Sequence, residues 1–293
     1  MNSNSHSALS CIALWVLGIS SAALNVSLVH AEERQGLLLN AGITAEYDDN
    51  VLRKNNAVSD NSLSIAPKAQ YLTNFGKHLF YAKYKGDYAA YNHNSDLNHD
   101  DHDLGLFARF DHNLKINTEF GFSYKDKIEQ PGTNNSSTEF FTQFNDTTQA
   151  NAKAKFFYGS NSSIGQLVFG LDYGQNRYTN NLQSYRDVDT ARFSTTFYYR
   201  IAPKTRLLFQ ASANQYEYVE QTQFPKQSSV DTFLLAGIEW DITAKTSGTF
   251  KVGYQGKDYD EAVYNDFSGL SYMLDMTWKP NTYSKIKIAA SRM

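Results

Sequence analysis

The sequence predicts an all-β protein, a transmembrane antiparallel up-and-down β-barrel of the bacterial outer membrane. Three features support this prediction. Apolar and polar residues alternate over segments of about ten residues, the length of a tilted strand that crosses a bilayer. Short and long polar connections follow one another along the chain, and no apolar helix is available to cover the apolar faces of the strands.

The hairpin at residues 189–218, DTARFSTTFYYRIAPKTRLLFQASANQYEY, shows the alternation most clearly. One face of its first strand carries Ala191, Phe193, Thr195, Phe197, Tyr199 and Ile201, and the other face carries polar or charged residues at most positions. Pro203 then breaks the pattern, because proline has no amide hydrogen and favours a turn. Alternation resumes at Leu207. The period of two predicts strands and excludes helices here.

The same pattern recurs from residue 37 onward and predicts about thirteen strands. The alternating segments are 37–47, 63–71, 80–88, 104–110, 116–124, 150–156, 167–173, 189–201, 207–213, 234–240, 250–254, 270–278 and 286–290. If the first strand starts in the periplasm, every long connection lies outside the cell, as in outer-membrane barrels. A soluble sandwich or solenoid is the alternative, but it would need a second apolar layer that the polar faces do not supply.

The N-terminal and C-terminal segments of the sequence each support a separate prediction. Residues 8–29 are mostly apolar and Val29-His30-Ala31 resembles a cleavage site, so we predict a signal peptide over residues 1–31 and a barrel over 32–293. An uncleaved anchor is the alternative, but Ser20, Ser21 and Asn25 interrupt the apolar run that an anchor needs. Bacterial barrels have an even number of strands and end in the periplasm. Because the last segment runs outward to Met293, we expect the chain to be truncated at its C-terminus.

The composition favours half-buried pleated surfaces. Aromatic residues make up 14% of the 293 residues, with 20 Tyr and 19 Phe, and such residues suit strands and membrane interfaces. We expect one aromatic girdle from Tyr47, Tyr88, Tyr124, Tyr178 and Tyr254, and another from Tyr71, Phe110, Phe156, Tyr199, Trp240 and Trp278. The formal net charge of −3 gives no reason to expect nucleic-acid binding. The only cysteine, Cys11, lies in the predicted signal peptide, so thiol chemistry is not expected.

Alternation places more basic than acidic residues on the polar faces, which would line the lumen. The candidate lumen-lining basic residues are Lys83, Lys85, Arg109, Lys115, Lys125, Lys153, Lys155, Arg192, Arg200 and Lys251. Acidic residues expected on the same faces are Glu46, Asp87, Asp111, Glu119, Asp172, Asp231, Glu239 and Asp275. Rings of basic side chains favour anions in a pore. The alternative is a network of paired charges that fills a polar interior without selecting anything.

One predicted outside connection is rich in histidine and aspartate. It contains His93, His99 and His102 with Asp96, Asp100, Asp101 and Asp103. These residue types can bind a divalent metal, but their spacing matches no zinc motif, and we expect neither a metal nor a cofactor. Asp101, His102 and Asp103 are the best candidates for a catalytic base cluster. No nucleophile elbow or phosphate-binding loop accompanies them, so we expect the protein not to be an enzyme.

The segment AGITAEYDDNVLR (41–53), Pro67, YKGDYAAY (84–91) and the Asp/His run together resemble a family of outer-membrane β-barrel porins, the beta-barrel porin 2-like proteins. The resemblance covers most of the chain after the predicted signal peptide. It implies a role in exopolysaccharide or capsule production of Gram-negative bacteria. The ending IAASR (288–292) resembles a strand after which family members continue for several more hairpins, which is consistent with truncation.

Together, these observations predict a porin-like barrel that is exported through the periplasm to the outer membrane of a Gram-negative cell. We expect it to serve exopolysaccharide secretion or the passage of anionic solutes. The expected partners are outer-membrane lipids, an anionic polysaccharide and components of its export machinery, without nucleic acid. The first alternative is a non-conducting barrel that acts as a scaffold for a surface polysaccharide assembly. The second alternative is an outer-membrane enzyme that uses the His/Asp connection.

Overall fold

The computed structural model describes residues 35–130, 143–220, 225–241, 245–281 and 283–292, together with the backbone of residues 22–24, 242 and 243. The predicted signal peptide lies outside these residues except for the backbone of 22–24. None of the helices in the described segments is long and apolar enough to cross a membrane.

The described chain is a succession of strands with two short 3-10 helices, η1 and η2. In chain order, the elements are β1 (Ala22–Leu24), β2 (Gly36–Asp48), β3 (Asp60–Phe75), β4 (His78–Tyr91), η1 (Ser95–Leu97), β5 (His99–Asp111), β6 (Ile116–Glu129), β7 (Asn145–Tyr158), β8 (Gly165–Tyr178), η2 (Ser184–Arg186), β9 (Val188–Ala202), β10 (Thr205–Tyr218), β11 (Ser229–Thr243), β12 (Thr246–Tyr259), β13 (Phe267–Trp278) and β14 (Ile286–Arg292). The thirteen strands β2–β14 confirm the predicted number and type of elements.

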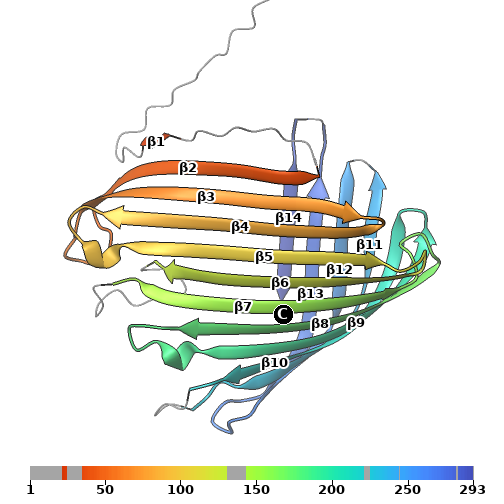
Figure 1. Cartoon of the computed structure of the whole chain (residues 1–293). Coiled ribbons are helices and arrows are strands. Elements are labelled where there is room, and N and C mark those ends of the chain that lie inside the picture. Colours follow the sequence, from red (N-terminus) through yellow and green to blue (C-terminus); the bar gives the residue numbers. More distant parts are fainter. Residues whose placement is uncertain are drawn as a thin grey trace, which may run out of the picture.

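All the strands belong to one antiparallel sheet in which each strand pairs with its neighbours in sequence. This is the predicted up-and-down order. The sheet curls so that β11–β14 pass behind β2–β10 in the view of Figure 1. Within the described segments, β14 pairs only with β13 and the sheet is not closed. The wall of the barrel is therefore seen as a curled, open sheet.

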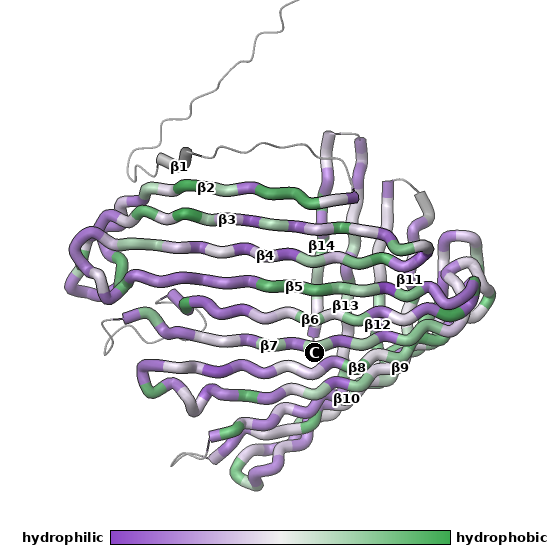
Figure 2. The backbone as a smooth tube through the Cα atoms, viewed as in Figure 1, coloured by the Kyte–Doolittle hydropathy of each residue, from purple (hydrophilic) through white to green (hydrophobic). Residues whose placement is uncertain are grey.

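The two faces of the sheet differ as the alternation predicts. Large apolar side chains on one face are exposed, for example Leu39 at 64%, Leu171 at 60% and Phe209 at 55%, and they would contact lipid in a membrane. Figure 2 shows hydrophobic segments interrupted by hydrophilic ones along β2 and β3. We call this face the apolar face.

The other face is concave. Lys251 Nζ on β12 lies 2.8 Å from Gln210 Oε1 on β10, and Arg206 on β10 donates a hydrogen bond of 2.9 Å to Gln166 on β8. Curvature of the strands toward each other favours such contacts between side chains two strands apart. The polar residues therefore line the inside of the curled sheet, which we call the concave face.

The connections alternate in length as predicted. Residues 76–77 and 203–204 form tight turns at one end of the sheet, whereas residues 49–59 and 179–187 form long connections at the other end. Gly76 and Gly159 have positive φ angles of 61° and 99°, which L-residues rarely adopt, and both lie in connections at the tight-turn end. By analogy with outer-membrane barrels, we expect the tight turns to face the periplasm, and we call the end with the long connections the outer mouth.

The aromatic girdles are seen with one correction. Tyr47, Tyr88, Tyr254, Tyr71 and Tyr199 are exposed on the apolar face, near the ends of their strands. Tyr178, predicted in the outer girdle, instead lies under the Arg186 guanidinium and donates a hydrogen bond to Glu129. It is an even-numbered residue of β8, whereas the apolar face of this strand carries the odd-numbered Leu171 and Tyr173. Its parity therefore places Tyr178 on the concave face.

Candidate functional site

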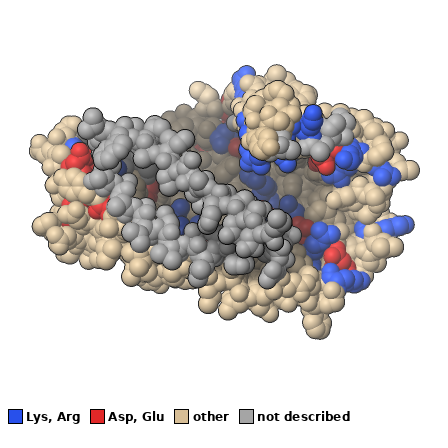
Figure 3. Space-filling view, turned by 90° about the horizontal axis from the view of Figure 1, so that it is seen from above, with Lys and Arg blue, Asp and Glu red and all other residues tan. Residues whose placement is uncertain are grey.

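The concave face carries a band of charged side chains, and Figure 3 shows Lys and Arg along the hollow inside the curled sheet. Part of this charge is neutralised within the wall. Lys83 pairs with Asp103 at 3.4 Å, and Lys153 pairs with Asp172 at 3.1 Å. Arg109 lies 3.1 Å from Asp111 and 3.9 Å from Glu119. These three predicted basic residues belong to charge pairs, as the network alternative predicts.

Other predicted basic residues have no carboxylate partner among the described residues. Arg192 donates through Nε to Asn214 Oδ1 at 2.7 Å, and the Lys251 ammonium donates to Gln210 Oε1. No ion pair is formed within the described segments by Lys85, Lys115, Lys125, Lys155 or Arg200. Of this last group, Lys115 lies in the exposed connection between β5 and β6 and not in a strand. The wall therefore keeps an excess of unpaired positive charge.

Four of the predicted basic residues meet at one hollow of about 590 Å3, lined by Lys153, Lys155, Arg192 and Lys251. The hollow lies over β7–β13 and contains two carboxylates, Asp172 and Asp231. Both are already paired, because Asp172 accepts from Lys153 and Asp231 lies 2.9 Å from Lys257 Nζ. The remaining charge at the hollow is positive.

The concave face also holds charges that sequence reasoning missed. Arg206 pairs with Glu239, hydrogen-bonds Gln166 and stacks 4.1 Å from the centre of the Tyr198 ring. Asp103 is the partner of Lys83. Both residues have the parity of the concave face in their strands, so alternation alone could have found them. The same face is not uniformly polar, since Leu208 and Leu235 are buried on it.

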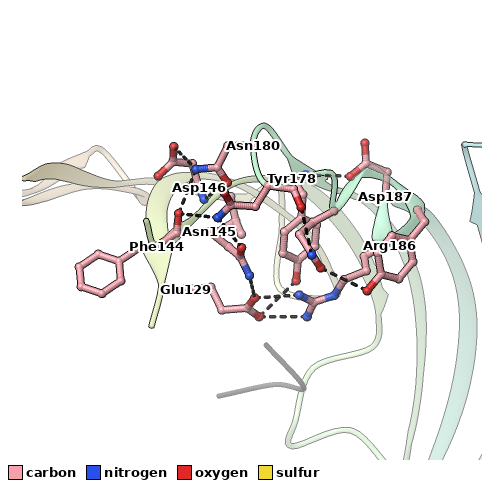
Figure 4. Close-up of polar contacts among 12 residues, drawn as sticks. Glu129, Phe144, Asn145, Asp146, Tyr178, Asn180, Arg186 and Asp187 are labelled. Atoms are coloured by element: carbon pink, nitrogen blue, oxygen red, sulfur yellow. Dashed lines mark hydrogen bonds and ion pairs between the residues drawn. The ribbon is translucent and has the colours of Figure 1, made fainter. Parts of the chain in front are cut away.

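At the outer mouth, a buried ion pair fastens the connection between β8 and β9 to the end of β6 (Figure 4). The Arg186 guanidinium donates two hydrogen bonds to the Glu129 carboxylate, at 2.8 and 3.0 Å. Asn145 Nδ2 and the Tyr178 hydroxyl also donate to this carboxylate, at 3.0 and 3.2 Å. The side chains of Glu129 and Arg186 are only 6% and 18% exposed. We call Glu129, Asn145, Tyr178 and Arg186 the mouth clamp.

The electrostatics of the mouth clamp favour its charged form. Burial raises the pKa of Glu129, but the hydrogen bonds from Arg186 and Asn145 outweigh burial and hold this pKa below its ordinary value. The next carboxylate, Asp187, accepts a backbone hydrogen bond from Tyr178 at 2.7 Å. Burial dominates there and raises the pKa of Asp187. As the pH falls, Asp187 therefore takes up a proton at a higher pH than Glu129 does.

A small apolar cluster joins other connections at the same end. Val51, Leu52, Leu97 and Phe144 are buried together, and they come from three different long connections or their edges. The ring of Phe144 packs edge-on against Tyr91 and His99, at 6.0 and 5.8 Å between centroids. The outer connections of β2–β7 therefore form one packed unit.

The structure separates the candidate base cluster. His102 contacts Tyr84 at 2.9 Å and the ring of Tyr88, both on the apolar face. Asp101 accepts a backbone hydrogen bond from Ile128, and Asp103 pairs with Lys83 on the concave face. Because neighbouring residues of a strand point to opposite faces, His102 cannot act together with both aspartates. These three residues therefore do not form one catalytic cluster.

The three histidines also lie apart. His93 pairs with Asp60 at 3.1 Å, and His99 hydrogen-bonds the Leu97 carbonyl at 2.9 Å. Among the described residues, no group of three or more His, Cys, Asp or Glu is placed to share a metal ion. The predicted connection is also shorter than expected, because β5 begins at His99, so that His99 and His102 lie in the strand and only His93 lies in the connection.

An up-and-down antiparallel sheet with an apolar face suited to lipid and a charged concave face defines the wall of a membrane β-barrel. The sequence profile of the family described as "Putative beta-barrel porin 2" matches residues 40–293. The chain belongs to this family, which confirms the resemblance and indicates an outer-membrane protein. A comparison with curated protein sequences found no match.

Proposed function

We propose that this porin-family protein passes anionic solutes across the outer membrane of a Gram-negative cell. The observation that carries the proposal is the unpaired positive charge on the concave face, where Lys155, Arg192 and Lys251 have no carboxylate partner among the described residues. Unpaired cations along a polar wall raise the local concentration of anions and lower the barrier to their passage.

Single-channel recording in planar bilayers tests this proposal. The reversal potential under a tenfold KCl gradient reports whether chloride or potassium carries the current. We expect anion selectivity that weakens when Lys155 and Lys251 are both replaced by Gln. The double change Lys115→Gln/Lys204→Gln, in exposed connections outside the strands, is the control and should leave the selectivity nearly unchanged. Cation selectivity in the unaltered protein would refute the proposal.

We also propose that its cargo in the cell belongs to the export of an exopolysaccharide. This step rests on the family resemblance together with the positive wall, which suits an acidic glycan. Deleting the coding sequence should reduce extracellular acidic polysaccharide without reducing its cytoplasmic precursors, and the Lys155/Lys251 double variant should restore less export than the unaltered protein. Normal secretion in the deletion strain would remove the polysaccharide role and leave the conduit proposal intact.

A second candidate, a non-conducting scaffold, is favoured by one observation. The mouth clamp and the apolar cluster hold several outer connections against one another, as expected of a rigid surface platform. A folded protein with heat-modifiable gel mobility but no conductance would support this candidate. Crosslinking in cells would then be expected to capture partners through the outer connections.

A further inference from the structure

The hollow of about 590 Å3 on the concave face has a floor made of small residues. Gly170, Ser194 and Ser212 lie side by side on β8, β9 and β10, since Gly170 pairs with Ser194 and Ser194 pairs with Ser212. A Cβ atom on Gly170 would lie 2.6 Å from Ser194 Oγ. The depth of the hollow therefore depends on glycine at this position.

The rim of the hollow presents positive charge. Lys155 stands at one end of the floor row, because it pairs with Gly170 across β7 and β8. Both oxygens of Asp172 are already used, one by Lys153 at 3.1 Å and the other by Asn151 at 2.6 Å. Arg192, the cross-strand partner of Asp172, donates through Nε to Asn214, and its two terminal nitrogens can bind a ligand.

Neutral polar groups and an apolar wall complete the hollow. The Ser194 and Ser212 hydroxyls can each donate and accept hydrogen bonds. The Asn214 and Gln210 oxygens accept from Arg192 and Lys251, which leaves both side-chain NH2 groups as donors. Phe233 continues the floor row as the partner of Ser212, beside the buried Leu235. The volume lies in the range of ligand pockets that combine apolar walls with a few converging polar groups.

We propose that this hollow binds a sugar acid, a ring that carries both a carboxylate and several hydroxyl groups. Lys155 and Arg192 bind the carboxylate, the serine hydroxyls and amide NH2 groups bind the ring hydroxyls, and Phe233 packs against the apolar face of the ring. A simple inorganic anion would leave the hydroxyl floor and the apolar wall unused, and a neutral sugar would leave the cations unpaired. This inference deepens the proposed conduit by giving it a specific subsite in its wall.

The proposal is tested by calorimetric titration of the detergent-solubilised protein with three probes: D-glucuronate, D-glucose and acetate. We expect D-glucuronate to bind at least about tenfold more tightly than either of the others, because each of them satisfies only half of the site. Equal affinity for D-glucuronate and acetate would show simple anion attraction and overturn the proposal. Equal affinity for D-glucuronate and D-glucose would overturn the role of Lys155 and Arg192.

Variants localise the site. Lys155→Gln and Ser212→Val should each weaken D-glucuronate binding about tenfold, whereas Lys125→Gln, which removes an unpaired cation elsewhere on the wall, should leave it unchanged. If Lys125→Gln weakened D-glucuronate binding as much as Lys155→Gln does, binding would depend on the positive potential of the whole wall and not on this hollow. That result would overturn the proposal. Heat-modifiable gel mobility confirms that each variant is folded.

The outcomes separate this inference from the proposed function. Anion-selective conductance without D-glucuronate binding would overturn the subsite and leave the conduit. D-glucuronate binding that depends on Lys155, in a protein without conductance, would support the subsite and overturn the conduit.

Discussion

The mouth clamp allows a quantitative prediction. Replacing Arg186 by Ala leaves the Glu129 carboxylate buried without its two guanidinium hydrogen bonds. Removing one partner of a buried ion pair costs about 3–5 kcal/mol. Because the Arg186 side chain is 18% exposed, water can enter and rehydrate the carboxylate, so we place the cost at the lower limit, about 3 kcal/mol.

This cost falls on the local opening of the connection between β8 and β9. The hydrogen bonds from Asn180 to Phe144 O and Asp146 remain in the variant, and so does the rest of the sheet. A local loss of about 3 kcal/mol corresponds to more than a hundredfold increase in the equilibrium constant for opening. We therefore expect amide hydrogen exchange in residues 179–187 to accelerate by about that factor at neutral pH.

Mass spectrometry of exchange in detergent measures this effect peptide by peptide. Arg53→Ala is the matched control, because Arg53 pairs with Asp48 at 3.1 Å but is 57% exposed, and such a pair is worth no more than about 1 kcal/mol. The double variant Glu129→Gln/Arg186→Ala should exchange no faster than Arg186→Ala alone. Acceleration of less than about fivefold in Arg186→Ala would refute the idea that the clamp holds this connection.

Three further predictions follow from other parts of the structure. Because the pKa of Glu129 is lowered in the folded state, the stability that this carboxylate contributes is present above its ordinary pKa and is lost as the pH falls through the lowered value. Amide exchange of residues 179–187, corrected for the intrinsic rate, should therefore accelerate below about pH 4. The variant Glu129→Gln should abolish this acid response. In urea titrations of the protein in lipid vesicles, Leu171→Arg on the apolar face should lower the free energy of unfolding by about 2–4 kcal/mol. Thr196→Arg on the concave face should lower it by less than about 1 kcal/mol. Equal losses would contradict the assignment of the two faces. In the same titrations, Gly159→Ala should lower the free energy of unfolding by about 1–3 kcal/mol, because φ is 99° at this position and a Cβ atom would lie 2.5 Å from the Gly165 carbonyl oxygen. An unchanged midpoint of unfolding would contradict this explanation.

The sequence could predict the strands and their order because the determinants are local. A period of two is written into each segment, as in residues 189–201, and proline or polar residues mark the breaks. Alternation places Lys153, Lys155 and Lys251 on the polar faces of their strands, and all three line the hollow. These properties require no knowledge of which segments meet in space.

The mouth clamp could not be predicted in this way. Glu129 and Arg186 are 57 residues apart, and Arg186 lies in a connection where the period of two has no meaning. Residue type and position near a strand end predict that Tyr178 belongs to the outer girdle, whereas its even number in β8 places it on the concave face. Which lysines remain unpaired is equally non-local, because it depends on the register that brings Lys153 to Asp172 and Lys257 to Asp231. Pairing across strands, not composition, decides the remaining charge.

The apolar cluster of Val51, Leu52, Leu97 and Phe144 has a consequence for recognition of the folded protein by antibodies. An antibody that binds this end of the folded protein would contact a discontinuous epitope assembled from three connections. Synthetic peptides that copy a single connection would lack the neighbours that fix its shape, and would make poor immunogens for the native surface. Exchanging one connection between strains would alter the antigenic character of the other two.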